Sequence, residues 1–138
     1  MINSEAKKAL LEMMNKFKEN TEFWKEMMSD KRKSREGKLG SSNIRSVANI
    51  CENADCYEEL KLYIQYKIAK GNGWNDIFNE DMTFGQVVLK DMESIYKESN
   101  KDDEETIKRI GLYFGYLYWT KTYIEKGKLG GEKNESSK

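Results

Sequence analysis

The chain has 138 residues, which allows one domain with a substantial core but is too short for two. Charged residues make up 35% and apolar residues 38%, and proline is absent, a composition typical of a helical protein with charged outer faces. The 24 basic and 24 acidic residues cancel, so overall charge does not indicate nucleic-acid binding, and the lack of histidine excludes histidine-based catalysis and histidine metal sites. The charges are unevenly spread: residues 1–50 hold 11 basic and 7 acidic side chains, whereas residues 51–100 hold 5 and 10.

A first helix is expected over residues 4–18, with Asn3 or Ser4 as its N-cap. Its apolar stripe consists of Leu10, Leu11, Met14 and Phe17. The helical pattern either continues or restarts at residues 20–21, before a second apolar cluster of Phe23, Trp24, Met27 and Met28. We interpret the methionines as core residues because methionine fills irregular gaps; an adaptable groove for a partner is the alternative.

Residues 30–40 predict a basic surface loop. Five of the eight residues from 31 to 38 are basic, namely Lys31, Arg32, Lys33, Arg35 and Lys38. Lysine and arginine neutralise phosphates, so the loop is a candidate phosphate-binding segment. A solvated basic connector is the alternative and stays open, because basic runs of this kind are weakly specific.

The residues after Gly40 predict a second helix, in which Ser41 or Ser42 caps free backbone N–H groups. Its buried face consists of Ile44, Val47, Ala48 and Cys51. Arg45 lies in the first turn, where the helix macrodipole slightly disfavours a cation. Its position makes better sense if an anion binds beside the free N–H groups.

Two cysteines, Cys51 and Cys56, are expected to be reduced, small helix residues. We recognise no signal peptide, which favours a cytoplasmic location. A Cys-x4-Cys pair without further cysteine or histidine is a poor zinc site, so we expect neither a metal nor another cofactor.

Two capping boxes predict the next helices. One spans residues 55–58 and opens a helix that stops at Gly71. Residues 71–81 then predict a loop whose apolar residues fold back on the core: Trp74, Ile77 and Phe78. The second box, at residues 83–86, opens a helix with an inward face of Phe84, Val87, Val88, Met92, Ile95 and Tyr96.

A last helix is expected to begin with the carboxylates of residues 102–105 and to end near Gly127. Residues 107–124 are apolar on two sides, one of which carries Leu112, Tyr116, Trp119 and Tyr123, so this helix is expected at the centre of the bundle. We interpret its aromatic residues as core; stacking on unpaired bases is the alternative. Gly111 and Gly115 predict a notch for a neighbouring backbone, and the uncharged core is too short to span a bilayer.

The predicted fold is therefore an all-α, single-domain bundle of about five helices over residues 1–126, followed by a disordered polar tail over residues 127–138. The chain carries no enzyme signature: acidic pairs fall at helix starts, where capping explains them, and no glycine-rich phosphate loop is present. We expect a protein that is not an enzyme and has no small-molecule substrate. An enzyme with two carboxylates facing one cleft is the alternative.

The order of three features resembles a known family. Leu39-Gly40-Ser41-Ser42-Asn43-Ile44-Arg45 enters a helix, residues 60–70 form a helix that ends in Tyr66, Ala69 and Lys70, and an aromatic helix with Phe114 and Tyr118 closes the chain. This pattern, over roughly residues 38–124, is similar to the small subunit of the type III-A CRISPR effector complex.

The resemblance implies a non-catalytic, RNA-binding subunit in antiviral defence. Copies of such a subunit line up beside the paired guide and target RNA and hold the backbone, in contact with other subunits and with one another. By position, the implied phosphate contacts are Arg45 with Lys38, Ser41 and Ser42 nearby. Further candidates, chosen because they are basic and lie on the helices concerned, are Lys67, Lys70, Arg109 and Lys121. A helical protein–protein adaptor with no nucleic-acid role is the alternative hypothesis.

Overall fold

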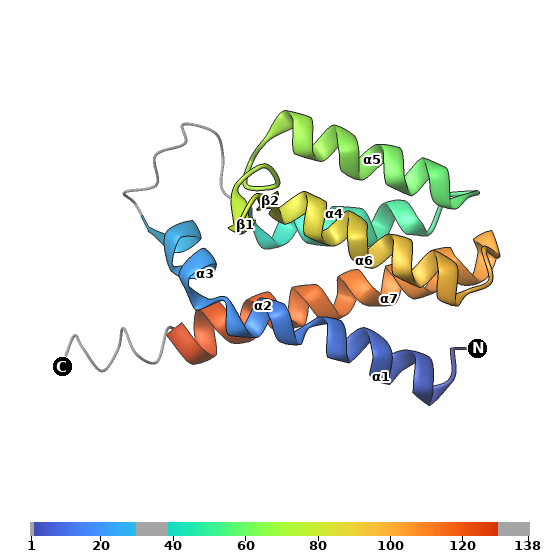
Figure 1. Ribbon diagram of the computed structural model, residues 1–138, viewed down its shortest axis with the longest axis horizontal. Coiled ribbons are helices and arrows are strands. Elements are labelled where there is room, and N and C mark those ends of the chain that lie inside the picture. The colour runs from blue at the N-terminus through green and yellow to red at the C-terminus, as the bar shows by residue number, and fades with distance from the viewer. Residues whose placement is uncertain (1, 30–38, 130–138) are drawn as a thin grey trace.

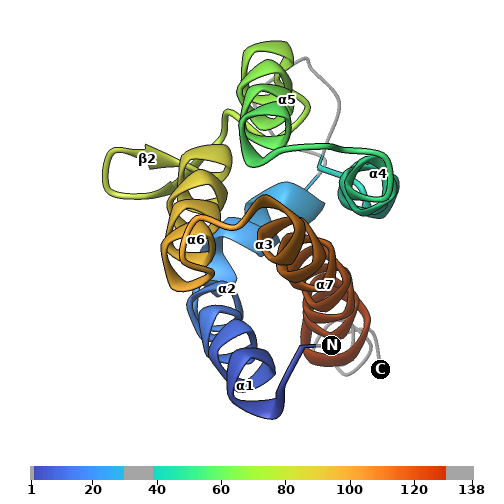
Figure 2. The ribbon, with the colours of Figure 1, turned by 90° about the vertical axis from the view of Figure 1, so that its right-hand side faces the viewer.

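The computed structural model of the chain describes residues 2–29 and 39–129, and these form a single, mostly helical domain. In chain order the elements are α1 (Ser4–Met13), α2 (Asn15–Glu19), α3 (Thr21–Met28), α4 (Ser41–Cys51), α5 (Tyr57–Lys70), β1 (Ile77–Asn79), β2 (Met82–Thr83), α6 (Phe84–Glu98), α7 (Asp103–Thr122) and the π-helix η1 (Tyr123–Lys128). The all-α prediction is confirmed. Figure 1 and Figure 2 show α6 and α7 side by side, with α1 and α2 on one side and α4 and α5 on the other.

The N-terminal helix expected over residues 4–18 is divided into α1 and α2. Asn3 is the N-cap of α1, since its side chain accepts a hydrogen bond from the Ala6 N–H at 2.8 Å. The helical pattern restarts at Asn20, whose backbone leaves the helical region (φ −88°, ψ 68°) and whose side chain accepts from the Phe23 N–H at 3.2 Å. The bend directs Phe17 and Trp24, both fully buried, into the same core.

Phe84, at the start of α6, is the centre of an aromatic cluster. Its ring lies 5.4 Å from the ring of Phe23 and 5.5 Å from that of Trp74, measured between centroids. Trp74 and Phe78 are buried as predicted, but Ile77 is 58% exposed, so that part of the prediction was wrong. The reason is the short antiparallel hairpin of β1 and β2: alternate residues of a strand face opposite sides, and Phe78 takes the inward one.

The start of α6 confirms the second predicted capping box. The Gln86 N–H donates to Thr83 Oγ1 at 3.1 Å, and the Thr83 N–H donates to Gln86 Oε1 at 2.8 Å. Five of the six residues predicted to face inward are buried, and Tyr96 is half-buried. Local sequence therefore determines both the start and the rotation of this helix.

The start of α5 differs from the capping box predicted at residues 55–58. Cys56 is the N-cap, and no hydrogen bond of its side chain to the helix is seen among the described residues. The Tyr57 N–H instead donates to Asp103 Oδ1 of α7 at 2.9 Å, and the Asp55 N–H donates to Glu59 Oε1 at 3.0 Å. A carboxylate from a distant helix thus supplies the cap.

The position of α7 at the centre of the bundle is confirmed, but its second apolar side is not fully buried. Ile110, Phe114 and Leu117 have no exposed surface, whereas Trp119 is 67% and Tyr123 is 55% exposed. The expected notch is also absent. A Cβ on Gly111 would only touch the Cys51 Cβ at 3.6 Å, and one on Gly115 would meet no described atom within 4 Å.

The C-terminal boundary lies beyond the expected one. Gly127 belongs to η1, which runs to Lys128, and Leu129 is 6% exposed. Residues 127–129 are therefore part of the fold rather than of a tail. The rest of the expected tail, residues 130–138, lies outside the described residues.

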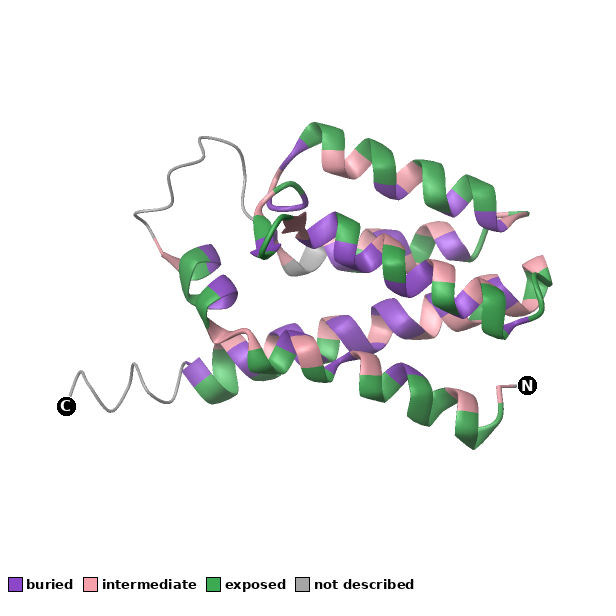
Figure 3. Cartoon of the chain, in the orientation of Figure 1, coloured by how far each residue is buried: buried purple, intermediate pink, exposed green. Residues whose placement is uncertain are grey.

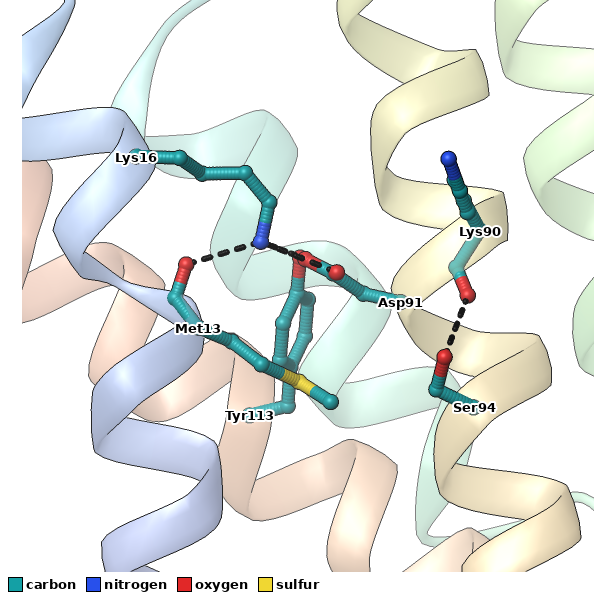
Figure 4. A network of polar contacts seen from close by, with 6 residues as sticks. All are labelled: Met13, Lys16, Lys90, Asp91, Ser94 and Tyr113. Atoms are coloured by element: carbon teal, nitrogen blue, oxygen red, sulfur yellow. Dashed lines mark hydrogen bonds and ion pairs between the residues drawn. The ribbon is translucent and has the colours of Figure 1, made fainter.

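A buried polar network joins three helices (Figure 4). Asp91 of α6 accepts hydrogen bonds from Lys16 Nζ of α2, at 2.9 and 2.8 Å, and from the Tyr113 hydroxyl of α7 at 2.6 Å. Lys16 Nζ also donates to the Met13 carbonyl at 2.9 Å. Burial, together with the Asp91 carboxylate, raises the pKa of Tyr113 well above its ordinary value. The buried carboxylate is thereby paired and hydrogen-bonded, as burial of a charge requires.

Truncating the core of α7 is expected to be costly. Phe114→Ala should lower the free energy of unfolding by about 3–5 kcal/mol, because a fully buried ring leaves a cavity. Urea unfolding measures this. Trp119→Ala, on the same helix but exposed, is the matched control and should change stability by less than about 1 kcal/mol. Equal effects of the two substitutions would contradict the observed rotation of α7.

Removing the Tyr113 hydroxyl should weaken the fold and reduce its sensitivity to alkali. The folded chain holds this proton at a pH where an unfolded tyrosine, with a pKa of about 10, loses it, so stability falls as pH rises above about 10. Tyr113→Phe should cost about 1–3 kcal/mol at neutral pH and lose part of that alkaline decline. Urea unfolding at neutral pH and at about pH 10.5 tests this. Tyr66→Phe, at an exposed tyrosine, is the control, and an unchanged pH dependence in Tyr113→Phe would refute the assignment.

Candidate nucleic-acid interface

The first turns of α4 and the last turns of α5 and α7 lie at the same end of the bundle (Figure 1). Residues 30–38, between α3 and Leu39 in the sequence, lie outside the described residues. The candidates Lys31, Arg32, Lys33, Arg35 and Lys38 are therefore not placed. Ser41 and Ser42 are the first residues of α4, and their side chains are likewise outside the description.

The start of α4 is fixed by a close contact between two turns. Leu39, immediately before it, is buried against Gly73. A Cβ on Gly73, whose φ is +96°, would lie 2.6 Å from the Leu39 nitrogen, so only glycine permits this approach. The N-cap itself is Gly40 rather than the expected serine, because its extended backbone (φ −92°, ψ 165°) places Ser41 inside the helix.

Arg45 lies on the exposed side of α4, one turn from its start. Its Nη2 donates to the Tyr118 hydroxyl of α7 at 2.6 Å, and its guanidinium carbon lies 4.7 Å from the centre of the Tyr118 ring. A guanidinium has five N–H donors, and this bond uses one of them. Tyr118 therefore orients Arg45 and leaves donors available for a phosphate.

Two lysines lie at the end of α5, and one of them, Lys67, contacts the flank of α4 opposite Arg45. Lys67 Nζ is 3.4 Å from Asn43 Oδ1, which connects the last turn of α5 to the first turn of α4. Lys70 is exposed, with its Nζ 5.5 Å from the centre of the Tyr66 ring. The pKa of Tyr63 is raised, chiefly by burial. Its neighbour Tyr66 adds to this rise, and the Lys70 ammonium opposes it. The structure thus brings Arg45, Lys67 and Lys70 to one end of the molecule.

The two remaining candidates are engaged in ion pairs with residues of their own helix or of its continuation. Lys121 is 4% exposed and lies 2.5 Å from Glu125, in the wall of a hollow beside Gly40. Arg109 Nε lies 2.7 Å from Glu105 in the first half of α7, toward the opposite end of the bundle. Lys121 therefore borders the candidate interface with its charge already neutralised, and Arg109 lies apart from it.

The aromatic and amide partners of these cations were not predicted from the sequence. Tyr118 and Asn43 both hold a candidate cation in place, and Tyr66 lies beneath Lys70. Asn43 had a sequence signal, because it belongs to the helix-entry motif. Tyr118 was named only for its aromatic character in the closing helix and was interpreted as core, so nothing in the sequence indicated its contact with Arg45.

A groove of about 770 Å³ lies between α4 and the first half of α7, at the other end of the bundle. Three carboxylates line it, from Glu52, Asp55 and Glu104, and all three residues are exposed. Glu104 is 3.3 Å from the Lys108 ammonium. The enzyme alternative requires two carboxylates that face one cleft. None of these three is a buried acid of the kind that is typical of a catalytic site, so the groove does not favour that alternative.

Replacing Lys121 should mainly affect stability. Lys121→Met is expected to lower the free energy of unfolding by about 1–3 kcal/mol, because it leaves the largely buried Glu125 carboxylate without this partner. Arg45→Ala, at an exposed cation, should cost less than about 1 kcal/mol. Thermal unfolding of both variants makes the comparison, and a Lys121→Met protein as stable as the wild type would contradict a stabilising role for this ion pair.

Candidate metal sites and membrane spans are both absent from the described residues, 2–29 and 39–129. Within these ranges, no group of three or more histidine, cysteine, aspartate or glutamate residues is arranged to hold a metal ion. No helix in this described part is both long and apolar enough to cross a membrane. Comparison with protein-family models, with curated proteins and with solved structures finds no match for this chain.

Proposed function

We propose that this chain is a non-catalytic, RNA-backbone-binding small subunit of a type III-A CRISPR ribonucleoprotein complex. The observation that carries the proposal is the arrangement of Arg45 and Lys67 on either flank of the first turns of α4. These turns contain the Leu39–Arg45 motif on which the family resemblance rests. The partners would be the guide and target RNA, neighbouring subunits and further copies of this chain.

The physical basis is the attraction of phosphate to a helix N-terminus beside cations. The first turn of α4 contains no acidic residue, so its partial positive charge is not offset within that turn. Arg45, which is oriented by Tyr118, and the lysines at the end of α5 add cationic donors around it. Contacts of this type recognise the backbone rather than the bases, so binding would be independent of sequence and sensitive to salt.

The distribution of carboxylates supports one RNA-facing end. The first turn of α5 carries Glu58 and Glu59, and that of α7 carries Asp103, Glu104 and Glu105. Figure 1 shows that both helices begin at the end of the bundle away from the start of α4. Repulsion of phosphate there would direct RNA to the end that carries Arg45.

The test is RNA binding as a function of salt. Arg45→Ala combined with Lys70→Ala should weaken binding of a fluorescent single-stranded RNA and lower the slope of log affinity against log salt by about 1 for each phosphate that is no longer bound. Fluorescence anisotropy measures both quantities. Lys97→Ala, at an exposed lysine of α6, is the matched control and should behave as the wild type. Unchanged affinity and slope in the double variant would remove these residues from the interface.

A protein–protein adaptor is the second candidate function, favoured by the exposure of Trp119, Tyr123 and Leu11. Trp24, in the apolar cluster of α3, has no exposed surface and belongs to the core. An adaptor would retain one protein partner in pull-downs after nuclease treatment and lose it in Trp119→Ala. RNA binding at physiological salt, abolished in the Arg45 variant, would exclude an adaptor with no nucleic-acid role.

A further inference from the structure

The outer side of α7 and η1 presents two aromatic side chains to solvent. Trp119 is 67% and Tyr123 is 55% exposed, although both belong to the most apolar stretch of the chain. They border a hollow of about 290 Å³, together with Tyr116 and with Leu11, Met14 and Lys18 from the N-terminal helices. Figure 3 shows α2 and the last part of α7 side by side, with exposed positions along both.

The two exposed rings are held by their neighbours. The Trp119 ring lies 5.6 Å from the buried Tyr116 ring, at an interplanar angle of 49°. The Tyr123 ring lies over Gly127, since a Cβ built on Gly127 would be 3.2 Å from Tyr123 Cδ1. A platform of this kind loses little conformational freedom when a flat ligand stacks on it.

Two lysines lie at or near this hollow. Lys18 lines it and is exposed, and the exposed Lys128 places its Nζ 3.5 Å from the Lys18 carbonyl. The neighbouring carboxylate, Glu125, is paired with Lys121. Lysine is depleted in protein–protein interfaces, whereas aromatic faces beside lysines suit a strand whose bases stack and whose phosphates pair with ammonium groups.

The hollow and the candidate RNA interface include consecutive residues of α7. Tyr118, which holds Arg45, and Trp119 are consecutive residues of α7, so their side chains lie about 100° apart around the helix. Gly115, one turn before Trp119, meets no described atom within 4 Å of an added Cβ. A strand held by Arg45 can therefore cross the outer side of α7 and reach Trp119 without an obstructing side chain at Gly115.

We propose that Trp119 and Tyr123 form a stacking site for an unpaired base of single-stranded RNA, with Lys18 and Lys128 pairing with its phosphates. This inference rests on the proposed function and adds a base-dependent contact to the backbone contacts at Arg45. The site accepts any base, because every base has a π-face.

Intrinsic fluorescence tests the site directly. Trp24 and Trp74 have no exposed surface, so Trp119 is the exposed tryptophan among the three in the chain. The probes are an oligouridylate of about 12 nucleotides and an abasic oligomer with the same number of phosphates. The oligouridylate should quench Trp119 and bind roughly 5- to 150-fold more tightly than the abasic oligomer.

Substitutions separate the two contacts. Trp119→Ala and Tyr123→Ala should each reduce the preference for the base-containing oligomer while retaining binding of the abasic one. Trp119→Phe should keep part of the preference, and Leu62→Ala, at an equally exposed apolar residue of α5, should keep all of it. Arg45→Ala should instead weaken the binding of both oligomers.

Each contrary outcome overturns the stacking site in a recognisable way. Equal affinities for the two oligomers, with Trp119 unquenched, would refute the stacking site and leave the backbone interface intact. Binding of neither oligomer would refute the proposed function as well. A shift of Trp119 emission that depends on protein concentration, without RNA, would assign the hollow to a contact between copies of the chain.

Discussion

Asp91 is a carboxylate in the protein interior, and its need for partners determines how three helices meet. An unpaired buried carboxylate is costly, so Lys16 and Tyr113 must both reach it. These bonds fix α7 in rotation and along its axis relative to α2 and α6, while apolar burial supplies most of the stability. The rotation of α7 that directs Tyr113 toward Asp91 also places Trp119 and Tyr123 on the outer side of the helix. The polar network and the exposed aromatic residues are therefore two consequences of one helix orientation.

The helix starts explain why an anion would be drawn to one place. Carboxylates lie in the first turns of α1, α3, α5 and α7, α6 begins with the capping box of Thr83 and Gln86, and the short α2, which also lacks an acidic first turn, follows α1 with only Met14 between them. The first turn of α4 has no acidic residue, and its N-cap, Gly40, has no side chain that could cap it. Arg45 would be unfavourable beside this positive end without an anion, and Tyr118 compensates in part by accepting a hydrogen bond and offering its ring. The N-terminus of α4 and the Arg45 guanidinium are two positive groups that lie close together, an arrangement that suits phosphate.

Local patterns in the sequence were sufficient for the helices, for one capping box and for most of the core. The box of Thr83 and Gln86 was predicted correctly because a capping box is complete within four residues. The burial of three side chains, those of Ile77, Trp119 and Lys121, was not predicted. Burial depends on how much of a helix or strand is packed against neighbouring elements. Periodicity says which residues share a face of a helix but not how wide an arc is buried. The candidate interface was located only in part for the same reason: Arg45 had a sequence signal, whereas its partner Tyr118 comes from a helix 73 residues further along the chain.

The two proposed kinds of RNA contact, charge pairing with phosphates and stacking on bases, have different physical origins. Arg45 and Lys18 would act through charge, so their contribution declines as salt displaces them from phosphate. Trp119 would act through stacking, which depends on surface removed from water and is much less affected by salt. An RNA strand that crosses α7 from Tyr118 to Trp119 would make the charged contact and the stacking contact at consecutive residues of one helix. Because Tyr118 already restrains the guanidinium, little side-chain entropy remains to be lost on binding. Such a surface would hold RNA of any sequence, yet distinguish unpaired bases from a bare chain of phosphates.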